Sequence, residues 1–203
     1  MKRIGIAKGR GLDKCIALLG NPEVYKAIME EDRLHYKDDT MEVVIVRGAD
    51  LAYAAKNNFI DIAIGSQLLF AENIIHKMQY MGALPISDCR LSLIGKADST
   101  LQDVRIVGTR YPRVTVGKLN KLNLHPEIME LSGCLESWLL NDSCDAIVDV
   151  IKTGNTIALY NFKELVRLAP VEHGIWLNNE REDLQTFVSE VRQGKLSKYN
   201  LIQ

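Results

Sequence analysis

The stretch that decides the fold reads CDAIVDV at residues 144–150 and continues as IKTGNTIAL at residues 151–159. The first seven residues form an apolar, β-rich run that ends beside an acidic side chain, Asp149. Small and hydroxyl-bearing residues around Gly154 then interrupt the run, and a second apolar segment follows. A strand that turns abruptly into a helix is typical of α/β proteins. We therefore expect an α/β fold with this turn at one edge of a sheet.

The turn itself has the features of a phosphate-binding loop. At the start of a helix, backbone N–H groups and the positive end of the dipole favour an anion. Gly154 allows close approach of the backbone, and the hydroxyls of Thr153 and Thr156 can donate as well. Asp149 is placed to accept from ribose hydroxyls. The glycine spacing matches neither a Walker loop nor a dinucleotide fingerprint, and an ordinary corner capped by Thr153 or Asn155 is the alternative.

The rest of the chain alternates short β-rich runs with amphipathic stretches, which favours mixed, mostly parallel sheets flanked by helices. Strands are predicted at residues 3–7, 42–47, 61–64, 79–84, 90–94, 105–108, 127–131, 144–150 and 174–177. Helices are predicted at residues 11–19, 50–57, 67–77, 112–122, 135–141 and 183–193. The mixed charges of residues 30–39 are interpreted as a solvated turn.

Two seams divide the chain. Each of them, at residues 85–88 and 169–170, places a proline and small residues between strand-like runs. If both are crossovers, residues 89–169 form one lobe, which carries the phosphate loop. Residues 1–88 and 170–203 then form the other, discontinuous lobe, with a cleft between the two. This is the arrangement of hinged, periplasmic-binding-protein-like folds.

Composition excludes several classes of function. The net charge of −1 gives no global field toward nucleic acid or an anionic membrane, so neither is expected as a partner. No run approaches the roughly 18 apolar residues of a membrane span, and the first apolar run is too short for a signal-peptide core. The four cysteines are scattered without metal-site spacing. We therefore expect a cytoplasmic protein without a metal site built from its own side chains.

Several motifs together resemble the ATP phosphoribosyltransferase family, which opens histidine biosynthesis. The run from Asp145 to Asp149, followed by TGNT at residues 153–156, is similar to the family's ribose-phosphate loop. Four further landmarks stand in the family's order: Lys8-Gly9-Arg10, Arg47-Gly48-Ala49-Asp50, Thr109-Arg110-Tyr111-Pro112 and Gly133-Cys134-Leu135-Glu136. The length resembles the short form of the family, which lacks a C-terminal regulatory domain.

Three positions depart from the family pattern. Gly11 stands where the family has leucine, and Ser66-Gln67 stands where it has Lys-Asp. The segment Leu139–Asp142 lacks the usual proline and glycine. The first two changes bear on substrate contacts in the N-terminal lobe.

The resemblance implies a glycosyltransferase that joins ATP to phosphoribosyl pyrophosphate, giving N1-(5-phosphoribosyl)-ATP and pyrophosphate. It implies that Thr153, Gly154, Asn155 and Thr156 seat the 5′-phosphate. Asp149 would hold the ribose hydroxyls as a catalytic residue, and Glu136 would orient the adenine or the ribose. The remaining substrate-binding residues are Lys8, Arg10, Arg47, Arg110 and Tyr111.

The resemblance also implies partners. Magnesium would accompany the pyrophosphate, and short forms work with a subunit similar to histidyl-tRNA synthetase. A homodimer or larger assembly is expected, and hence a hetero-oligomer with that subunit. Three alternatives stay open: a two-lobed module that binds a small anion without chemistry, a phosphoribosyltransferase for another base, and a catalytically inactive homologue.

Overall fold

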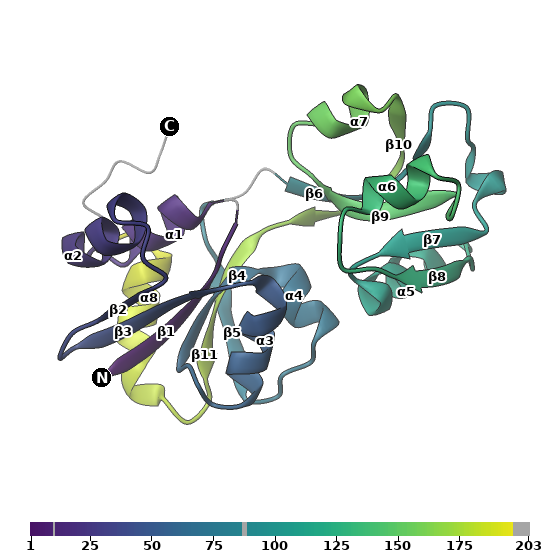
Figure 1. The fold of residues 1–203 in the computed structure, drawn as a ribbon. Coiled ribbons are helices and arrows are strands. Elements are labelled where there is room, and N and C mark those ends of the chain that lie inside the picture. The colour runs from purple at the N-terminus through teal and green to yellow at the C-terminus, as the bar shows by residue number, and fades with distance from the viewer. Residues whose placement is uncertain (10, 87–88, 197–203) are drawn as a thin grey trace. The chain divides into compact units, whose positions relative to one another are not determined.

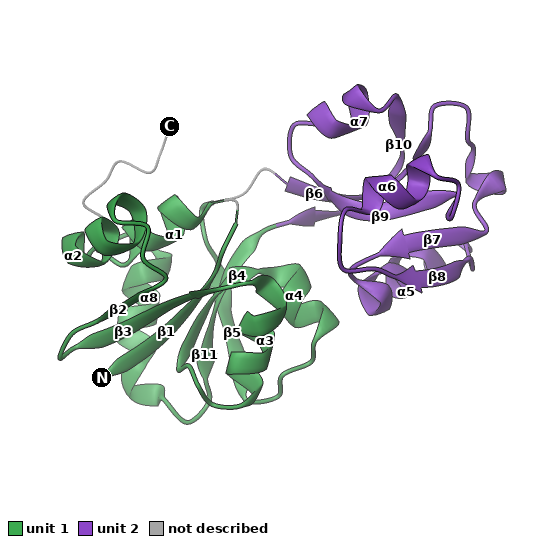
Figure 2. Cartoon of the chain, in the orientation of Figure 1, with its two compact units in different colours: residues 1–87, 172–203 green, residues 88–171 purple. Residues whose placement is uncertain are grey.

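The structure, a computed structural model, describes residues 1–9, 11–86 and 89–196. The chain forms two compact units, coloured separately in Figure 2. Unit 1 contains residues 1–87 and 172–203, and unit 2 contains residues 88–171. The sequence analysis predicted the boundaries between the two lobes at residues 88–89 and 169–170. None of the described helices is long and apolar enough to cross a membrane.

Unit 1 is a six-stranded sheet with the strand order β2-β3-β1-β4-β11-β5 (Figure 1). Its strands are β1 (Lys2–Ala7), β2 (His35–Lys37), β3 (Met41–Val46), β4 (Ile62–Ser66), β5 (Met78–Ala83) and β11 (His173–Asn178). Its helices are α1 (Leu12–Leu18), α2 (Pro22–Tyr25) continued by a π-helical turn (Lys26–Glu30), α3 (Gly48–Lys56), α4 (Gln67–Glu72), and α8 (Gln185–Arg192) after a 3-10 turn (Glu182–Leu184).

Successive side chains along the strands of unit 1 point to opposite faces of the sheet, and both faces are buried. Ile4 and Ile6 of β1 pack with Ile16 of α1 and Val188 of α8 in one core cluster. The opposite face packs against α3, where Leu51 joins a second cluster with Trp176 of β11 and residues of α4. Helices therefore cover both faces of the sheet, as the sequence predicts (Figure 1).

Unit 2 is a five-stranded sheet with the strand order β10-β6-β9-β7-β8. Its strands are β6 (Cys89–Lys96), β7 (Ile106–Thr109), β8 (Glu127–Glu130), β9 (Ala146–Ile151) and β10 (Phe162–Val171). Its helices are α5 (Pro112–Asn120), α6 (Leu135–Leu140) and α7 (Asn155–Leu159), with a 3-10 turn at Leu101–Asp103. Leu135 and Leu139 of α6 pack on Ile147 and Ile151 of β9.

The sheets are mixed, as predicted, but the proportion of parallel strand pairings is smaller than the sequence analysis expected. Four of the nine strand pairings between described residues are parallel, two in each unit. The antiparallel pairings come mainly from β6, β10 and β11. These strands lie next to the two points where the chain passes between the units, near residues 87–88 and 171–172.

Three elements differ from the sequence-based assignment. Strand β2 lies inside the segment interpreted as a solvated turn, and residues 22–30 are helical where no helix was predicted. Residues 162–171 form the longest strand, β10, so the seam at Ala169-Pro170 lies within a strand rather than between two. Pro170 is tolerated there because β10 is an edge strand with register shifts in its pairing to β6.

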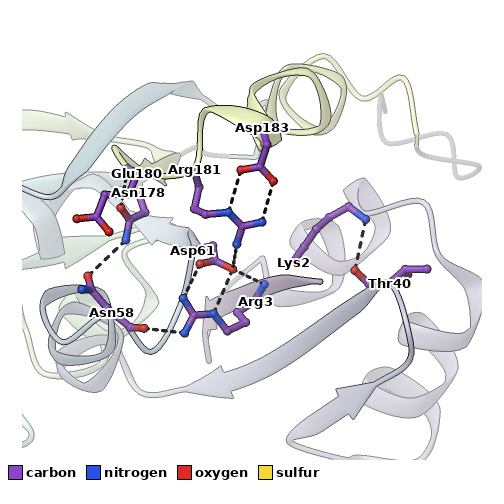
Figure 3. A network of polar contacts seen from close by, with 9 residues as sticks. All are labelled: Lys2, Arg3, Thr40, Asn58, Asp61, Asn178, Glu180, Arg181 and Asp183. Carbon is purple, nitrogen blue, oxygen red and sulfur yellow. Dashed lines mark hydrogen bonds and ion pairs between the residues drawn. The ribbon is translucent and has the colours of Figure 1, made fainter.

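A buried carboxylate connects the first strand of unit 1 to the segment before α8 (Figure 3). Asp61 is fully buried, and Arg3 binds it through Nη2 at 2.5 Å from Oδ1 and Nε at 3.2 Å from Oδ2. Arg181 Nη1 lies 2.6 Å from Asp61 Oδ2, and its other nitrogens contact Asp183. Burial alone raises the pKa of Asp61, but hydrogen bonds from Arg3 and Arg181 outweigh it and hold that pKa below its ordinary value.

We expect Asp61→Ala to lower the free energy of unfolding by about 3 kcal/mol, because it leaves two guanidinium groups without their buried partner. Asp183→Ala should cost less than about 1 kcal/mol, since its carboxylate is 63% exposed. Because the folded-state pKa of Asp61 is lowered, its contribution is complete above the unfolded pKa of about 3.9 and is lost as the pH falls below it. Urea unfolding at pH 7 and pH 3 tests both points, and equal losses in the two variants at pH 7 would contradict them.

Candidate functional site

The predicted phosphate loop lies between β9 and α7 in unit 2. Gly154 has φ 82° and ψ 6°, a left-handed backbone conformation that favours glycine, and it precedes the first residue of α7. Its carbonyl accepts from the N–H of Ala158 at 3.0 Å, which starts the helix. The first N–H groups of α7 have no acceptor within the helix itself, and that of Asn155 donates to Thr153 Oγ1 at 3.5 Å. Thr153, Asn155 and Thr156 are exposed beside them.

Asp149 lies inside β9 rather than at its end, because the strand continues to Ile151. It stands opposite Ser92 of β6, and its Oδ1 accepts from the N–H of Val150 at 2.8 Å. Its side chain is 19% exposed. The sequence interpretation, which placed the strand at residues 144–150 with Asp149 just before the loop, therefore began it two residues early and ended it one residue early. The carboxylate nevertheless stays open to solvent near the end of the strand.

The structure brings Arg110 to Asp149. Arg110 Nη2 lies 3.5 Å from Asp149 Oδ2. Arg110 follows β7, and the buried hydroxyl of Thr109 fixes this strand end by donating to the carbonyl of Val148 at 3.2 Å and accepting from the N–H of Tyr111 at 3.0 Å. Tyr111 is half-buried at the start of α5. Two predicted site residues from different strands thus form one ion pair at the carboxyl ends of parallel strands.

Lys8 and Arg47 lie together in unit 1, at the carboxyl ends of neighbouring parallel strands. β1 pairs with β3 through Ala7 and Val46, and the N–H of Lys8 continues the ladder to the carbonyl of Val46 at 2.7 Å. Both side chains are exposed, and Arg47 directly precedes α3. No ion pair joins Arg47 to Asp50, although both lie within the described part of the chain. Arg10 lies outside the described residues.

Glu136 is half-buried in the first turn of α6. Its neighbours Leu135 and Leu139 pack on the face of the sheet that contains Ile147 and Ile151. Asp149 lies between these two isoleucines along β9, two residues from each. Side chains two residues apart in a strand point to the same face, so the Asp149 side chain shares the face of Ile147 and Ile151. The structure thus places Glu136 on a helix that covers the Asp149 face.

Two departures from the family pattern have structural roles. Gly11 has φ 78°, a conformation that leucine adopts only with strain, and a Cβ there would lie 2.8 Å from Ile86 Cγ2. Ser66 precedes α4, and its Oγ accepts from the N–H of Leu68 at 3.3 Å. Both residues therefore shape the starts of helices in unit 1.

Sequence reasoning missed a polar cluster next to Asp149. Arg90 and Ser92 of β6 and Glu164 of β10 are joined by hydrogen bonds of 2.7–2.9 Å. The sequence does contain a signal for two members of this cluster. Polar Arg90 and Ser92 alternate with the buried Leu91 and Leu93, which places both polar side chains on one face of the strand. Their partner Glu164 was not predictable, because β10 was not recognised as a strand.

The described residues contain no group of three or more His, Cys, Asp or Glu side chains that could hold a metal ion. The donor set for a cation near the loop is the carboxylate of Asp149. It fits a magnesium ion that is carried by substrate oxygens and water better than one enclosed by protein ligands.

Residues 47–194 match the family model described as ATP phosphoribosyltransferase, which is well over half of the chain. The chain belongs to the ATP phosphoribosyltransferase family. Two curated relatives with that name come from Deinococcus deserti and Staphylococcus carnosus. The first is 28% identical over 80% of this chain and 75% of its own length, and the second is 26% identical over 84% of each.

Solved structures show the same fold. The ATP phosphoribosyl transferase (HisG:HisZ) complex from Thermotoga maritima contains a chain with a TM-score of 0.74 at 18% identity, covering 96% of this chain and 98% of that one. The P235GK mutant of ArgBP from T. maritima has a TM-score of 0.60 at 13% identity, with 96% of this chain and 91% of that one covered. The likeness to ArgBP confirms the predicted two-lobed, binding-protein-like α/β class for this ATP phosphoribosyltransferase family member.

Proposed function

We propose that this chain transfers the phosphoribosyl group of phosphoribosyl pyrophosphate to N1 of ATP, which is the first step of histidine biosynthesis. The observation that carries the proposal is the β9–α7 loop, in which left-handed Gly154 and the first N–H groups of α7 follow a strand that bears a partly exposed carboxylate. Membership of the ATP phosphoribosyltransferase family supports the choice of acceptor. The cytoplasmic location stays a prediction.

In this reaction the adenine N1 forms a bond to the anomeric carbon while the bond from that carbon to pyrophosphate breaks. No enzyme nucleophile is required, so the protein aligns the substrates and stabilises charge. Alignment supplies roughly 7–11 kcal/mol in well-oriented cases. Positive charge develops on the ribose ring, and the carboxylate of Asp149 is the group we assign to stabilise it and to accept from the ribose hydroxyls.

We assign binding roles to the residues of each unit in turn. In unit 2, Thr153, Gly154, Asn155 and Thr156 seat the 5′-phosphate on the N–H groups at the start of α7. Arg110 orients Asp149 in the structure and supplies a guanidinium fork for substrate phosphates, with Tyr111 beside it.

The residues of unit 1 form a basic edge for the remaining phosphates. Lys8, Arg47 and, by position in the sequence, Arg10 follow β1 and β3, and open α/β sheets bind ligands at such carboxyl ends. We assign these side chains to the pyrophosphate and the ATP phosphates, and Glu136 of α6 to orientation of the adenine or the ribose.

Members of the family generally depend on Mg²⁺. The ion would neutralise the leaving pyrophosphate, with substrate oxygens and water as its main ligands. We also propose a regulatory partner similar to histidyl-tRNA synthetase, because the Thermotoga maritima relative is a complex of HisG with HisZ. A homodimer or larger assembly belongs to the same proposal.

The direct test is pyrophosphate release from ATP and phosphoribosyl pyrophosphate with Mg²⁺, with and without a synthetase-like partner from the same source. Release that needs both substrates is the expected result, and a rise on adding the partner supports the proposed complex. If neither arm releases pyrophosphate while calorimetry still detects phosphoribosyl pyrophosphate binding, the chain is a binding module or an inactive homologue.

A further inference from the structure

The polar cluster of unit 2 lies beside Asp149 and the phosphate loop. Ser92 stands directly opposite Asp149 in the pairing of β6 with β9. Arg90 stands opposite Ile151, the last residue of β9 before the loop. Residues that face each other on neighbouring strands project their side chains to the same side of the sheet. The Arg90 side chain therefore lies on the Asp149 face, and its backbone stands beside the last residue of β9 before the loop.

Hydrogen bonds fix the orientation of Arg90. Its Nε donates to both carboxylate oxygens of Glu164 at 2.9 Å, and its Nη2 donates to Oε2 at 2.7 Å. Ser92 is fully buried, and its Oγ donates to Glu164 Oε1 at 2.7 Å. A bidentate pair of this kind holds the guanidinium plane in one orientation, and the serine holds the carboxylate.

Arg90 keeps donors for a ligand. The contact with Glu164 uses Nε and Nη2, and Nη1 has no hydrogen-bond partner among the residues that the structure describes. The side chain is 28% exposed, and the two N–H groups of Nη1 are donors that the pair with Glu164 does not use. The charges of Arg90 and Glu164 cancel, so directed N–H groups rather than net charge select the ligand. Phosphate oxygens are the acceptors that suit such an arginine.

We infer that Arg90 is a further substrate-binding residue, which donates from Nη1 to phosphate oxygens of phosphoribosyl pyrophosphate at the loop. Glu164 and Ser92 are its positioning residues. The inference rests on the proposed function and adds a contact outside the loop motif. A purely structural role, in which the pair joins the irregular edge strand β10 to β6, predicts a loss of stability with unchanged substrate affinity.

The test compares Arg90→Gln with Arg105→Gln. Arg105 is exposed just before β7 in the same unit, at the opposite end of the strand from Arg110, so the control removes the same charge away from the loop. For Arg90→Gln, we expect the Kd of phosphoribosyl pyrophosphate with Mg²⁺ and its KM to rise about ten- to hundredfold, as for a lost charge-assisted hydrogen bond. The kcat should change less than about threefold. Arg90→Lys, which keeps the charge without the fork, should give an intermediate Kd, and Arg105→Gln should match the wild type.

Wild-type affinity in a folded Arg90→Gln variant would overturn the inference. If that variant does not fold, modification of wild-type arginines by phenylglyoxal, mapped by mass spectrometry, decides the question. Saturating phosphoribosyl pyrophosphate should protect Arg90 and leave Arg105 equally modified, whereas equal modification of Arg90 with and without substrate refutes its role. Wild-type protein that neither binds phosphoribosyl pyrophosphate nor releases pyrophosphate overturns the proposed function itself.

Discussion

Replacing Asp149 with alanine should lower kcat by about 10²–10³-fold, the effect of removing one group that stabilises transition-state charge. The loss arises because Asp149 is the carboxylate that we assign to stabilise the positive charge on the ribose ring. Stability should change little. The ion pair with Arg110 spans 3.5 Å between side chains that are 19% and 43% exposed, and partly exposed pairs contribute at most about 1 kcal/mol. Pyrophosphate release and urea unfolding measure the two effects separately.

Asp145 provides the matched control. It precedes β9 at the other end, and its Oδ2 accepts from the N–H groups of Arg105 and Ile106 at 2.9 and 2.8 Å. Asp145→Ala should cost about 1–2 kcal/mol of stability for these two hydrogen bonds and leave kcat within about twofold. Wild-type kinetics in Asp149→Ala would exclude the assigned role. A kcat loss of the same size in both variants would mean that β9 as a whole, and not the carboxylate, was disturbed.

Buried apolar side chains give the clearest strand signals in the sequence. Ile4, Ile6, Ile62 and Ile64 are all fully buried, so burial on one or both faces leaves a clear signal in β1 and β4. β10 left no such signal, because the edge strand carries charges and Pro170 and only its ends are buried. Tertiary pairing with β6, rather than local propensity, makes this segment a strand.

The residues of the candidate site also differ in whether a local sequence pattern predicts them. Gly154 and Asp149 follow from a local pattern of strand, turn and helix, and the backbone of Gly154 agrees with it. The Arg90–Glu164 pair joins residues 74 positions apart. A contact at that separation depends on which strands are neighbours, and local periodicity carries no information about strand order. The turn at Gly154 was therefore predictable from the local pattern, whereas the pairing of Arg90 with Glu164 was not.

Gly154→Val should abolish detectable binding of phosphoribosyl pyrophosphate, with a Kd at least about 100-fold higher. Two effects combine. At φ 82° a β-branched residue is strained by about 1–2 kcal/mol, which shifts the loop away from its observed backbone. In addition, apart from the two chain neighbours of Gly154, no atom of the described residues lies within 4 Å of a Cβ built there, so a side chain would fill the open space through which, in the proposed function, the phosphate approaches the N–H groups. For the same reason no packed core is disturbed, and the fold should persist.

Gly154→Asn separates the two effects, because asparagine adopts the left-handed conformation more readily but still adds a side chain. If close approach of the backbone is what the phosphate needs, the asparagine variant should also bind weakly. Wild-type affinity in that variant would assign the loss in Gly154→Val to strain alone. Gly117 of α5, where a Cβ also meets no described atom within 4 Å, provides the control. Gly117→Ala should leave the calorimetric Kd unchanged and raise stability by about 0.4–1 kcal/mol. Normal affinity in Gly154→Val itself would refute the phosphate seat.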